Sequence, residues 1–442
     1  MSQPLDHWLA AGHRQAAAAM LASISPVGIV KSRPGFGQTV HAVPGSIVAS
    51  PVLASYDPDP DYFFHWYRDS AVVIDALRLL YRDATVGQGA LAQVADFVSF
   101  SLVLGRLDGR ALAASPEWRA AAAPDFVRFL RDDAELAAVH GEEAVAAETR
   151  VNPDGTLDIS RWARPQHDGP PLRALAVLRW LRTASFESGA EADAARLIRA
   201  DLAFTLHRWR QPSFDIWEEE PGQHYYTLRV SAAALEEGAA WMEDAGQLRE
   251  AQPYRAASEA IRHLLDGFWL EGEGYYRSRI LPSGARSPKE LDIAVILAAI
   301  HAGGEGGPHT VHDPRLQATL TRLEDLFDTA YPINRNRPPH TRPAMGRYPG
   351  DVYYSGGAYY FSTLGAAEFC YRAAAGADAG AWIERGDGFL ATVRAHTPAN
   401  GELSEQFDQR TGAQTSARHL AWSYAALISC AAARRAALDQ AG

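Results

Sequence analysis

Apolar residues recur along most of this chain at the spacing of an α-helix, three or four positions apart. Clear examples are residues 71–80, 172–181 and 291–300, in which apolar side chains form a continuous face. Similar segments follow from one end of the chain to the other. Their starts are expected near residues 5, 69, 88, 124, 170, 191, 227, 252, 289, 315, 356, 380 and 418. The pattern therefore predicts an all-α protein with about a dozen helices.

Strand signals are few by comparison. The best candidates are residues 43–53 and 275–280, which carry β-branched and aromatic residues between turn-forming ones. Both segments are short and lie between predicted helices. We expect them to be local pieces of strand rather than parts of one large sheet.

Several loops between the predicted helices are long and rich in Pro, Gly, Trp, Tyr and Asp. Each comes directly before a helical segment, and rigid scaffolds tend to carry their chemistry on such connections. If the helices pair into hairpins around a closed ring, every second loop opens on the same end. We therefore expect five loops to converge there: residues 56–69, 159–171, 214–226, 331–357 and 401–416.

The overall composition is that of a large globular domain. Of the 442 residues 47% are hydrophobic and 21% are charged, and no shift in composition marks a boundary, so residues 1–442 are expected to form one domain. The formal net charge of −11 argues against nucleic acid or an anionic membrane as a partner, because both need a basic surface. A neutral substrate fits this charge better.

The two cysteines, Cys370 and Cys430, each lie among small apolar residues in a helical pattern. Buried free thiols are therefore expected rather than a disulfide. The first residues show no basic segment followed by an apolar one, so no signal peptide is predicted and the chain is expected to be cytoplasmic. The longest apolar runs, such as residues 293–300, are too short to span a bilayer.

The richest candidate chemistry lies in residues 213–220, where Trp217 is followed by Glu218, Glu219 and Glu220. Such acids could form the acidic first turn of the next helix. Here Pro221 and Gly222 follow, which places the acids in a turn before the helix. Carboxylates beside aromatic rings suit a sugar site, because acids move protons and hold hydroxyl groups while rings cover the apolar faces of a pyranose.

A second acidic segment, residues 404–408, repeats this theme near the other end of the chain. It contains Glu405, which on its own could be a solvated loop acid. Glycoside hydrolysis requires two carboxyl groups that the fold brings together from separate segments. The two acidic segments predict such a pair.

Arg68 and Asp69 follow a run of aromatic residues at 62–67 and open a predicted helix. Asp69 could be only an N-cap, with Arg68 as its surface neighbour. The preceding rings favour a binding role, in which both side chains make charge-assisted hydrogen bonds to sugar hydroxyls.

Residues 162–171 precede another predicted helix, whose first turn contains Pro170 and Pro171. Helix initiation explains these prolines but not the polar and aromatic residues before them. We expect those residues to contact a ligand; they are Trp162, Arg164, Gln166 and His167.

Residues 345–360 interleave tyrosines with one arginine, Arg347, and one aspartate, Asp351. Tyrosines at this density often only pack, but the glycines predict a bent loop that brings the backbone near another group. The 15 histidines show no metal-ligand spacing, and no glycine-rich phosphate loop is present. No metal or other cofactor is therefore predicted.

These motifs together resemble those of the glucoamylase family, the inverting exo-acting α-glucan hydrolases of glycoside hydrolase family 15. They occur in the order and spacing of that family across nearly the whole chain. The matching segments are residues 45–51, 61–70, 162–170, 214–219, 346–349, 351–354, 404–408 and 421–424.

The resemblance implies an (α/α)6 barrel with the active site in the loops at one end. It matches Glu218 to the general acid, Glu405 to the general base and Glu219 to a residue near the leaving-group sugar. Contacts to glucose are implied for Arg68, Asp69, Trp162, Arg164 and Arg347. Trp217 and Tyr353 are further expected substrate contacts, and Asp215 and Trp422 also lie within matched motifs.

The implied activity is release of β-D-glucose from the non-reducing ends of short α-linked oligosaccharides. The α-1,4 linkage is expected first, with α-1,6 (isomaltose type) and trehalose as alternatives of the same family. From another class, a catalytically silent glucan-sensing module is the alternative, against which the presence of both Glu218 and Glu405 argues.

The chain also departs from the family pattern in one loop. Gly350 stands where an acid is common, Ser355 and Gly357 where asparagines are common, and Tyr359 where tryptophan is common. These changes concern the part of the site that would hold the leaving group. No separate β-domain or starch-binding module is expected in residues 1–442, so raw starch is not the expected substrate.

Overall fold

The computed structural model describes residues 5–55, 58–304 and 306–441, and its centre is a closed ring of helices. Within these residues, six helices form the ring, and each contacts the next until the last returns to the first. Their bounds are α2 (Tyr67–Arg82), α8 (Gly169–Thr183), α10 (Tyr225–Asp244), α12 (Ala294–Ala302), α14 (Tyr360–Ala373) and α16 (Ala421–Ala441).

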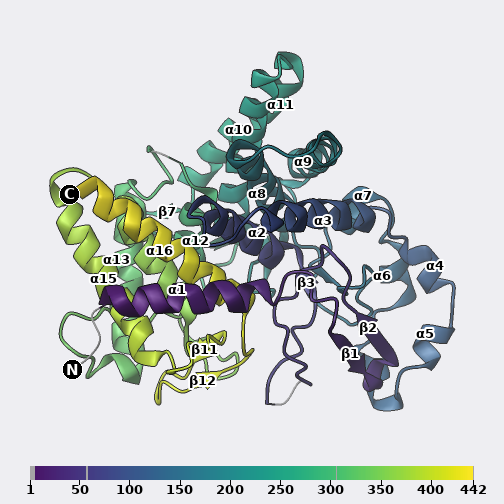
Figure 1. Cartoon of the computed structure of the whole chain (residues 1–442), viewed down its shortest axis with the longest axis horizontal. Coiled ribbons are helices and arrows are strands. Elements are labelled where there is room, and N and C mark those ends of the chain that lie inside the picture. The colour runs from purple at the N-terminus through teal and green to yellow at the C-terminus, as the bar shows by residue number, and fades with distance from the viewer. Residues whose placement is uncertain (1–4, 56–57, 305, 442) are drawn as a thin grey trace.

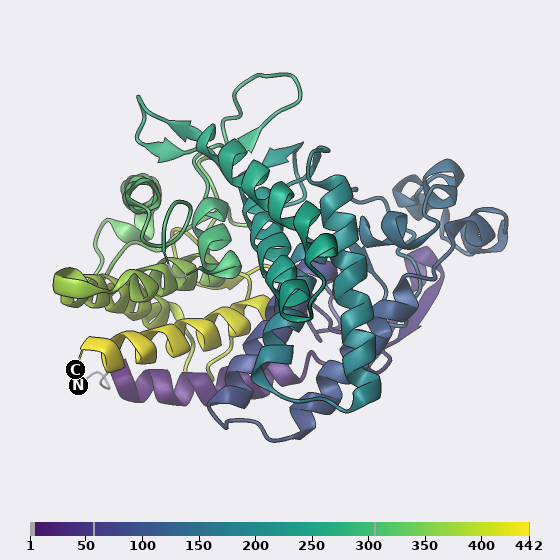
Figure 2. The same cartoon turned by 90° about the horizontal axis from the view of Figure 1, so that it is seen from above.

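A second layer of helices packs around this ring. Each outer helix contacts one or more inner helices, and α1 and α16 lie side by side in both views (Figures 1 and 2). The outer helices are α1 (Leu5–Leu21), α3 (Gly89–Leu104), α9 (Ser188–Arg208), α11 (Leu248–Asp266), α13 (Pro314–Ala330) and α15 (Ala379–His396). The fold is an (α/α)6 barrel, as expected.

The sequence explains which helices lie inside. Helix α14 is buried on nearly all sides and carries only two charged residues, Glu368 and Arg372, whereas α11 and α13 carry apolar residues on one face only. Glycines let neighbouring helices approach closely. A Cβ on Gly365 would lie 2.6 Å from Leu297, and one on Gly238 would lie 2.4 Å from Leu202. The inner ring therefore depends on small residues at its contacts.

All but one of the predicted helix starts are confirmed, since a helix begins within five residues of each. The prediction near residue 124 is wrong. That segment is a short 3₁₀ helix, η2 (Pro124–Phe129), in a lobe of short helices beside the barrel, seen on the right of Figure 1. The other short helices are α4 (Gly109–Ala113), α5 (Glu117–Ala120), α6 (Asp133–Ala137), α7 (Glu142–Ala146), η1 (Pro34–Phe36), η3 (Pro332–Asn334) and η4 (Gly376–Asp378).

The strand predictions are confirmed only in part. Residues 275–280 contain two short strands, β8 (Tyr275–Tyr276) and β9 (Arg279–Ile280), but residues 43–53 form only an isolated bridge between Ile47 and Ile24. An antiparallel hairpin of β1 (Val30–Arg33) and β2 (Gln38–His41), in which Val30 pairs with His41, was not predicted.

The remaining strands tie the long loops together in pairs and triplets. In these small antiparallel sheets β3 pairs with β4, β6 lies between β5 and β9, and β11 lies between β10 and β12, while β7 pairs with β8. Their bounds are β3 (His65–Trp66), β4 (Arg150–Val151), β5 (Ser213–Phe214), β6 (Pro221–His224), β7 (Trp269–Leu270), β10 (Ala358–Tyr359), β11 (Gln406–Phe407) and β12 (Gln414–Thr415). Three of these sheets fix loops that begin or end at an inner helix.

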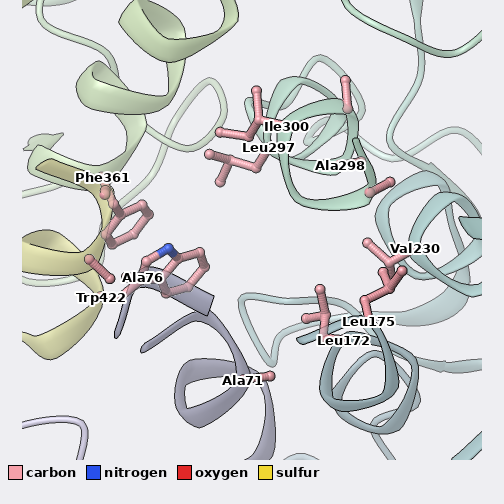
Figure 3. Packing of buried hydrophobic residues seen from close by; sticks show 14 of the residues in the cluster. Ala71, Ala76, Leu172, Leu175, Val230, Leu297, Ala298, Ile300, Phe361 and Trp422 are labelled. Carbon is pink, nitrogen blue, oxygen red and sulfur yellow. The ribbon is translucent and has the colours of Figure 1, made fainter. Parts of the chain in front are cut away.

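The core fills the space inside the ring. Figure 3 shows Leu172 and Leu175 of α8, Val230 of α10 and Leu297 of α12 pointing into this space. The rings of Phe361 and Trp422 are stacked at its edge. Cys370 and Cys430 are buried and unbonded, which confirms the prediction of free thiols. In the described part of the chain, no helix combines the length and the apolar character needed to cross a membrane.

Replacing Leu297 with alanine should destabilise the barrel. This side chain is 1% exposed inside the ring, so its loss removes buried apolar surface and leaves a cavity, at a cost of about 2–5 kcal/mol in the free energy of unfolding. Leu248→Ala is the matched control, because Leu248 is 67% exposed at the start of α11 and should change the stability by less than about 0.5 kcal/mol. Denaturant unfolding followed by tryptophan fluorescence measures both; equal effects would contradict the described packing.

Candidate active site

A cavity of about 260 Å³ opens at the end of the barrel where the inner helices begin. All five long loops contribute side chains to it, which confirms their predicted convergence, although Tyr56, at the start of the first loop, lies outside the described residues. The lining residues are Ala49, Tyr62, Trp66, Arg68, Asp69, Trp162, Ile216, Trp217, Glu218, Glu219, Arg347, Tyr353, Phe361, Glu405, Leu420 and Trp422. The volume is near the lower end of the range of about 300–1,000 Å³ for ligand pockets.

A larger hollow of about 860 Å³ lies at the opposite end, among the last turns of α2, α12, α14 and α16. Seven of its 20 lining residues are alanine, and two of its three arginines, Arg372 and Arg435, are already paired with Glu368 and Asp83. Size alone therefore does not identify the site. The smaller cavity combines carboxylates, cations and aromatic rings, and it is the better candidate on chemical grounds.

Glu218 lies on a tight turn between β5 and β6 that one buried carboxylate organises. Asp215 accepts hydrogen bonds from the backbone N–H groups of Trp217 (2.7 Å) and Glu220 (2.8 Å), and Arg279 donates to the same carboxylate at 3.2 Å. This arrangement holds Glu218 at a φ of +67°, a left-handed conformation that costs a non-glycine residue about 1–3 kcal/mol. The turn thus presents the Glu218 side chain to the cavity.

Three N–H groups orient the carboxylate of Glu218. The indole of Trp66 donates to Oε1 at 2.8 Å and the Arg68 guanidinium donates to the same oxygen at 3.2 Å, while the indole of Trp162 donates to Oε2. The sequence analysis did not single out Trp66 as a site residue. Its signal was its place in the aromatic run directly before Arg68.

Glu405 is the second carboxylate of the cavity, one residue before β11. Ser416 donates a hydrogen bond to its Oε2, and the Tyr62 hydroxyl lies 3.4 Å from both carboxylate oxygens. Burial raises the pKa of Glu405 to about 7, and the bond from Ser416 and the charge of Arg347 oppose this rise. A carboxylate with this pKa can take a proton near neutral pH.

Two aromatic residues separate Glu218 from Glu405. The Tyr62 and Trp66 rings lie 5.1 Å apart between centroids; Trp66 bonds to Glu218, and Tyr62 lies against Glu405. The Tyr62 hydroxyl also shares a hydrogen bond of 2.8 Å with that of Tyr353. The two carboxylates therefore have separate sets of partners in one cavity.

Arg68 and Asp69 begin the inner helix α2 and form a buried ion pair of 3.1 Å in the cavity wall. Oδ2 of Asp69 is the oxygen of this ion pair, and it accepts no other hydrogen bond in the described structure. Burial raises the pKa of Asp69 to about 6; Arg68 lowers it and Glu218 raises it. A carboxylate oxygen has two lone pairs, so Oδ2 can also accept a hydrogen bond from a ligand hydroxyl.

Glu219 faces a different group of cations at the cavity mouth. Arg347 donates to its Oε1 at 3.0 Å, Lys289 donates to its Oε2 at 2.7 Å, and the Tyr348 hydroxyl donates to the same oxygen. Burial alone would raise the pKa of Glu219, but Arg347, Lys289 and Tyr348 together lower it by more, so its pKa lies below the usual value. Glu219 is thus held ionised and fixed in position.

Stacked aromatic rings form the floor of the cavity. Phe361 and Trp422 are nearly parallel, with centroids 4.3 Å apart, and Trp217 stacks at 6.0 Å from Phe361. The indole N–H of Trp217 points away to Asp292, at 2.9 Å from its Oδ2. This floor is an apolar surface of the kind that packs against a sugar ring.

Comparison with known proteins identifies the family. The sequence matches the family described as Glycosyl hydrolases family 15 over residues 34–99, 147–383 and 377–432, most of the chain. The chain belongs to glycosyl hydrolase family 15.

Relatives with assigned names agree with this assignment. "Glucoamylase 1" of Rhizopus oryzae is 27% identical over 89% of this chain and 68% of its own length, and "Probable glucoamylase" of Schizosaccharomyces pombe is 29% identical over 89% and 85%. Among solved structures, the family 15 glucoamylase from Hypocrea jecorina superposes with a TM-score of 0.78 at 25% identity, over 98% of this chain and 72% of that one. The chain is a glycoside hydrolase of the glucoamylase type.

Within this family 15 site, three residues predicted to contact a ligand lie elsewhere. Arg164 is outside the cavity lining and pairs with Glu148 at 2.7 Å and Asp158 at 2.9 Å. Gln166 donates to the backbone of the turn that carries Glu218, at the Asp215 carbonyl (2.8 Å), and the buried His167 ring packs against Phe204. These polar residues of the motif support the cavity wall and do not line it.

The role of Arg164 follows from its neighbours. Its partner Asp158 also binds Arg150, whose guanidinium lies 3.6 Å over the Trp162 ring and 4.7 Å from the Trp66 ring. Arg164 therefore helps to fix the two indoles that bond to Glu218. The other residues predicted as catalytic or substrate-binding line the cavity, and Asp215 lies behind it, where it organises the turn of Glu218.

Replacing Ser416 with alanine should move the acid limb of the family 15 reaction to higher pH. The Ser416 hydroxyl stabilises ionised Glu405, so its loss raises the pKa of Glu405, and a base that must be ionised then becomes active only at higher pH. We expect a shift of about 0.5–1 pH unit in kcat/KM. Ser404→Ala is the matched control, because the Ser404 hydroxyl donates to the Gln406 carbonyl and not to Glu405. An unshifted limb in Ser416→Ala would show that Glu405 is not the group that titrates there.

Proposed function

We propose that the chain is an inverting exo-acting α-glucosidase that releases β-D-glucose from the non-reducing ends of short α-glucans, with the α-1,4 linkage preferred. The observation that carries the proposal is the pair of separately held carboxylates, Glu218 and Glu405, in one small cavity with an aromatic floor. The relatives named glucoamylases support the α-1,4 preference.

In the proposed mechanism the acid form of Glu218 protonates the glycosidic oxygen. Glu405 removes a proton from a water on the other face of the sugar, and that water attacks the anomeric carbon as the bond to the leaving group breaks. Inversion requires room for this water, with carboxyl groups about 6.5–9.5 Å apart. Glu218 and Glu405 contact different rings, Trp66 and Tyr62, whose centroids lie 5.1 Å apart, and this supports a gap between the two carboxyl groups.

Arg68 and Asp69 are the proposed anchors of the terminal glucose. Arg68 is a donor with two N–H groups, Nε and Nη1, that make no hydrogen bond in the described structure, and the Asp69 carboxylate is an acceptor, so the pair can hold hydroxyl groups as both donor and acceptor. Trp217, Phe361 and Trp422 would cover the apolar face of the ring. Trp162 and Tyr353 complete the walls around the scissile bond.

Glu219 is the proposed contact on the side of the leaving group, and Arg347, which donates to it at 3.0 Å, is a proposed contact to glucose. Three of the four departures in that region concern packing. A Cβ on Gly357 would lie 2.4 Å from the Phe407 carbonyl, Ser355 bonds to Gln406, and Tyr359 accepts a hydrogen bond from Gln406. Gly350 differs, because a Cβ there would meet nothing within 4 Å. Because these departures from the family pattern cluster in one loop on that side, α-1,6 is the second candidate.

We also propose that the enzyme acts in the cytoplasm. One relative, 26% identical over 96% of this chain and 83% of its own length, is named "Glucoamylase, intracellular sporulation-specific" in Saccharomyces cerevisiae. Buried free thiols in place of disulfides are consistent with a reducing compartment. Small soluble oligosaccharides would then be the substrates.

Proton NMR of the purified protein with maltotriose, isomaltotriose and trehalose in parallel tests the function. We expect β-glucose to appear first and maltotriose to be consumed fastest, because an inverting enzyme releases the opposite anomer of an α-linked substrate. Early α-glucose would exclude inversion, and preferred cleavage of isomaltotriose would select the α-1,6 alternative. Binding of sugar without hydrolysis would support a silent glucan sensor.

Replacing Glu405 with glutamine should abolish turnover but keep sugar binding. Glutamine has the same shape and still accepts hydrogen bonds, but it cannot take the proton from water, so kcat should fall by about two to four orders of magnitude. Glu402→Gln is the control, since Glu402 lies in the same loop but pairs with Arg418. Glucose binding by calorimetry and hydrolysis rates measure the two effects; full activity of Glu405→Gln would show that another group is the base.

A further inference from the structure

Asp168 is a buried carboxylate that the proposed mechanism does not use. It directly precedes the inner helix α8, is 1% exposed, and neither of its carboxylate oxygens has a hydrogen-bond partner in the described part of the chain. An acid buried in this way is costly unless a nearby charge or a function compensates. Its surroundings show what it can act on.

The nearest opposite charge is Arg68. Nη1 of Arg68 lies 3.7 Å from Oδ2 of Asp168, while Nη2 of the same guanidinium donates to Oε1 of Glu218 at 3.2 Å. Nε and Nη1 of Arg68 have no hydrogen-bond partner among the described residues. One guanidinium thus lies between the buried Asp168 and the proposed acid Glu218.

The other groups near Asp168 are few. Burial raises the pKa of Asp168 to about 7. Arg68 opposes this rise, and the like charges of Glu218 and Asp69 add to it. Tyr226 approaches from α10, and its hydroxyl is shared with His301 of α12 at 2.7 Å. Arg68 is the only cation among these neighbours, so the balance of charge around Glu218 depends on Asp168.

We propose that Asp168 is a positioning residue for the general acid, acting through the Arg68 guanidinium that contacts both carboxylates. An anion at Asp168 offsets part of the Arg68 charge beside Glu218. When Glu218 has given its proton to the leaving oxygen, Arg68 still holds the carboxylate that forms. This inference rests on the proposed function of Glu218.

Asp168→Asn in the full chain tests the proposal. Removing the anion favours loss of the acid's proton, so the alkaline limb of the kcat/KM profile should move to lower pH by about 0.5–1 unit. Asp201→Asn is the matched control, because Asp201 is a buried acid paired with Arg173 and remote from the cavity. It should lower the melting temperature and leave the limb in place. An unshifted limb in Asp168→Asn would overturn the proposal.

A second substrate separates positioning from a merely structural role. α-Glucosyl fluoride has a leaving group that needs little protonation, so Asp168→Asn should slow its hydrolysis much less than that of maltotriose, with the ratio changing at least about tenfold at alkaline pH. Equal losses on both substrates would indicate a structural role only. If Asp168→Asn does not fold, Asp168→Glu keeps the charge and should keep the alkaline limb; a shift to lower pH in that variant would equally overturn the proposal.

The proposed glycoside hydrolase function and the proposed role of Asp168 can be tested separately. If the wild-type chain hydrolyses none of the three test sugars, the proposed function is wrong. If the wild type is active and Glu218→Gln is not, but Asp168→Asn has the wild-type profile, then only the role of Asp168 is wrong.

Discussion

Closure of the inner ring is the constraint on which the rest of this structure depends. The ring closes where α16 packs back against α2. Because inner and outer helices alternate along the chain, the six inner helices all begin at one end of the barrel, and the loops that precede them meet there. The first turns of those helices offer unpaired backbone N–H groups and a positive dipole end. Buried acids such as Asp69 and Asp168, at the starts of α2 and α8, benefit from this environment. The ring therefore determines both the position of the cavity and its tolerance for several carboxylates.

Much of this architecture could be predicted from the sequence, because long helices with continuous apolar faces leave a clear period. Glu218 and Glu405 could also be predicted, since each lies in a short segment whose residue types suit only a few kinds of chemistry. The hairpin β1–β2 and the helix expected near residue 124 show the opposite case. Strands and helices of four to six residues, packed on one side only, leave no period that a sequence can display.

Within residues 162–171, the sequence did not show which side chains reach the cavity. Trp162 lines the cavity, but Arg164, Gln166 and His167 point into the protein, where they support other residues. A loop of irregular backbone has no fixed alternation of faces, so its sequence does not reveal which side chains reach the ligand. Each side chain that lines the wall here is supported by a buried charged residue behind it. Arg150, paired with Asp158, packs on Trp162, and Asp168 lies behind Arg68.

The left-handed backbone of Glu218 has a consequence for how this protein can change over time. Glycine adopts that conformation without strain, so a glycine at position 218 would relax the turn while removing the proposed acid. The residue with the least backbone strain at this position, glycine, is thus one that cannot donate a proton. Drift toward higher stability and selection for activity act in opposite directions here, and the Asp215 carboxylate, by fixing the turn, lets the active residue persist.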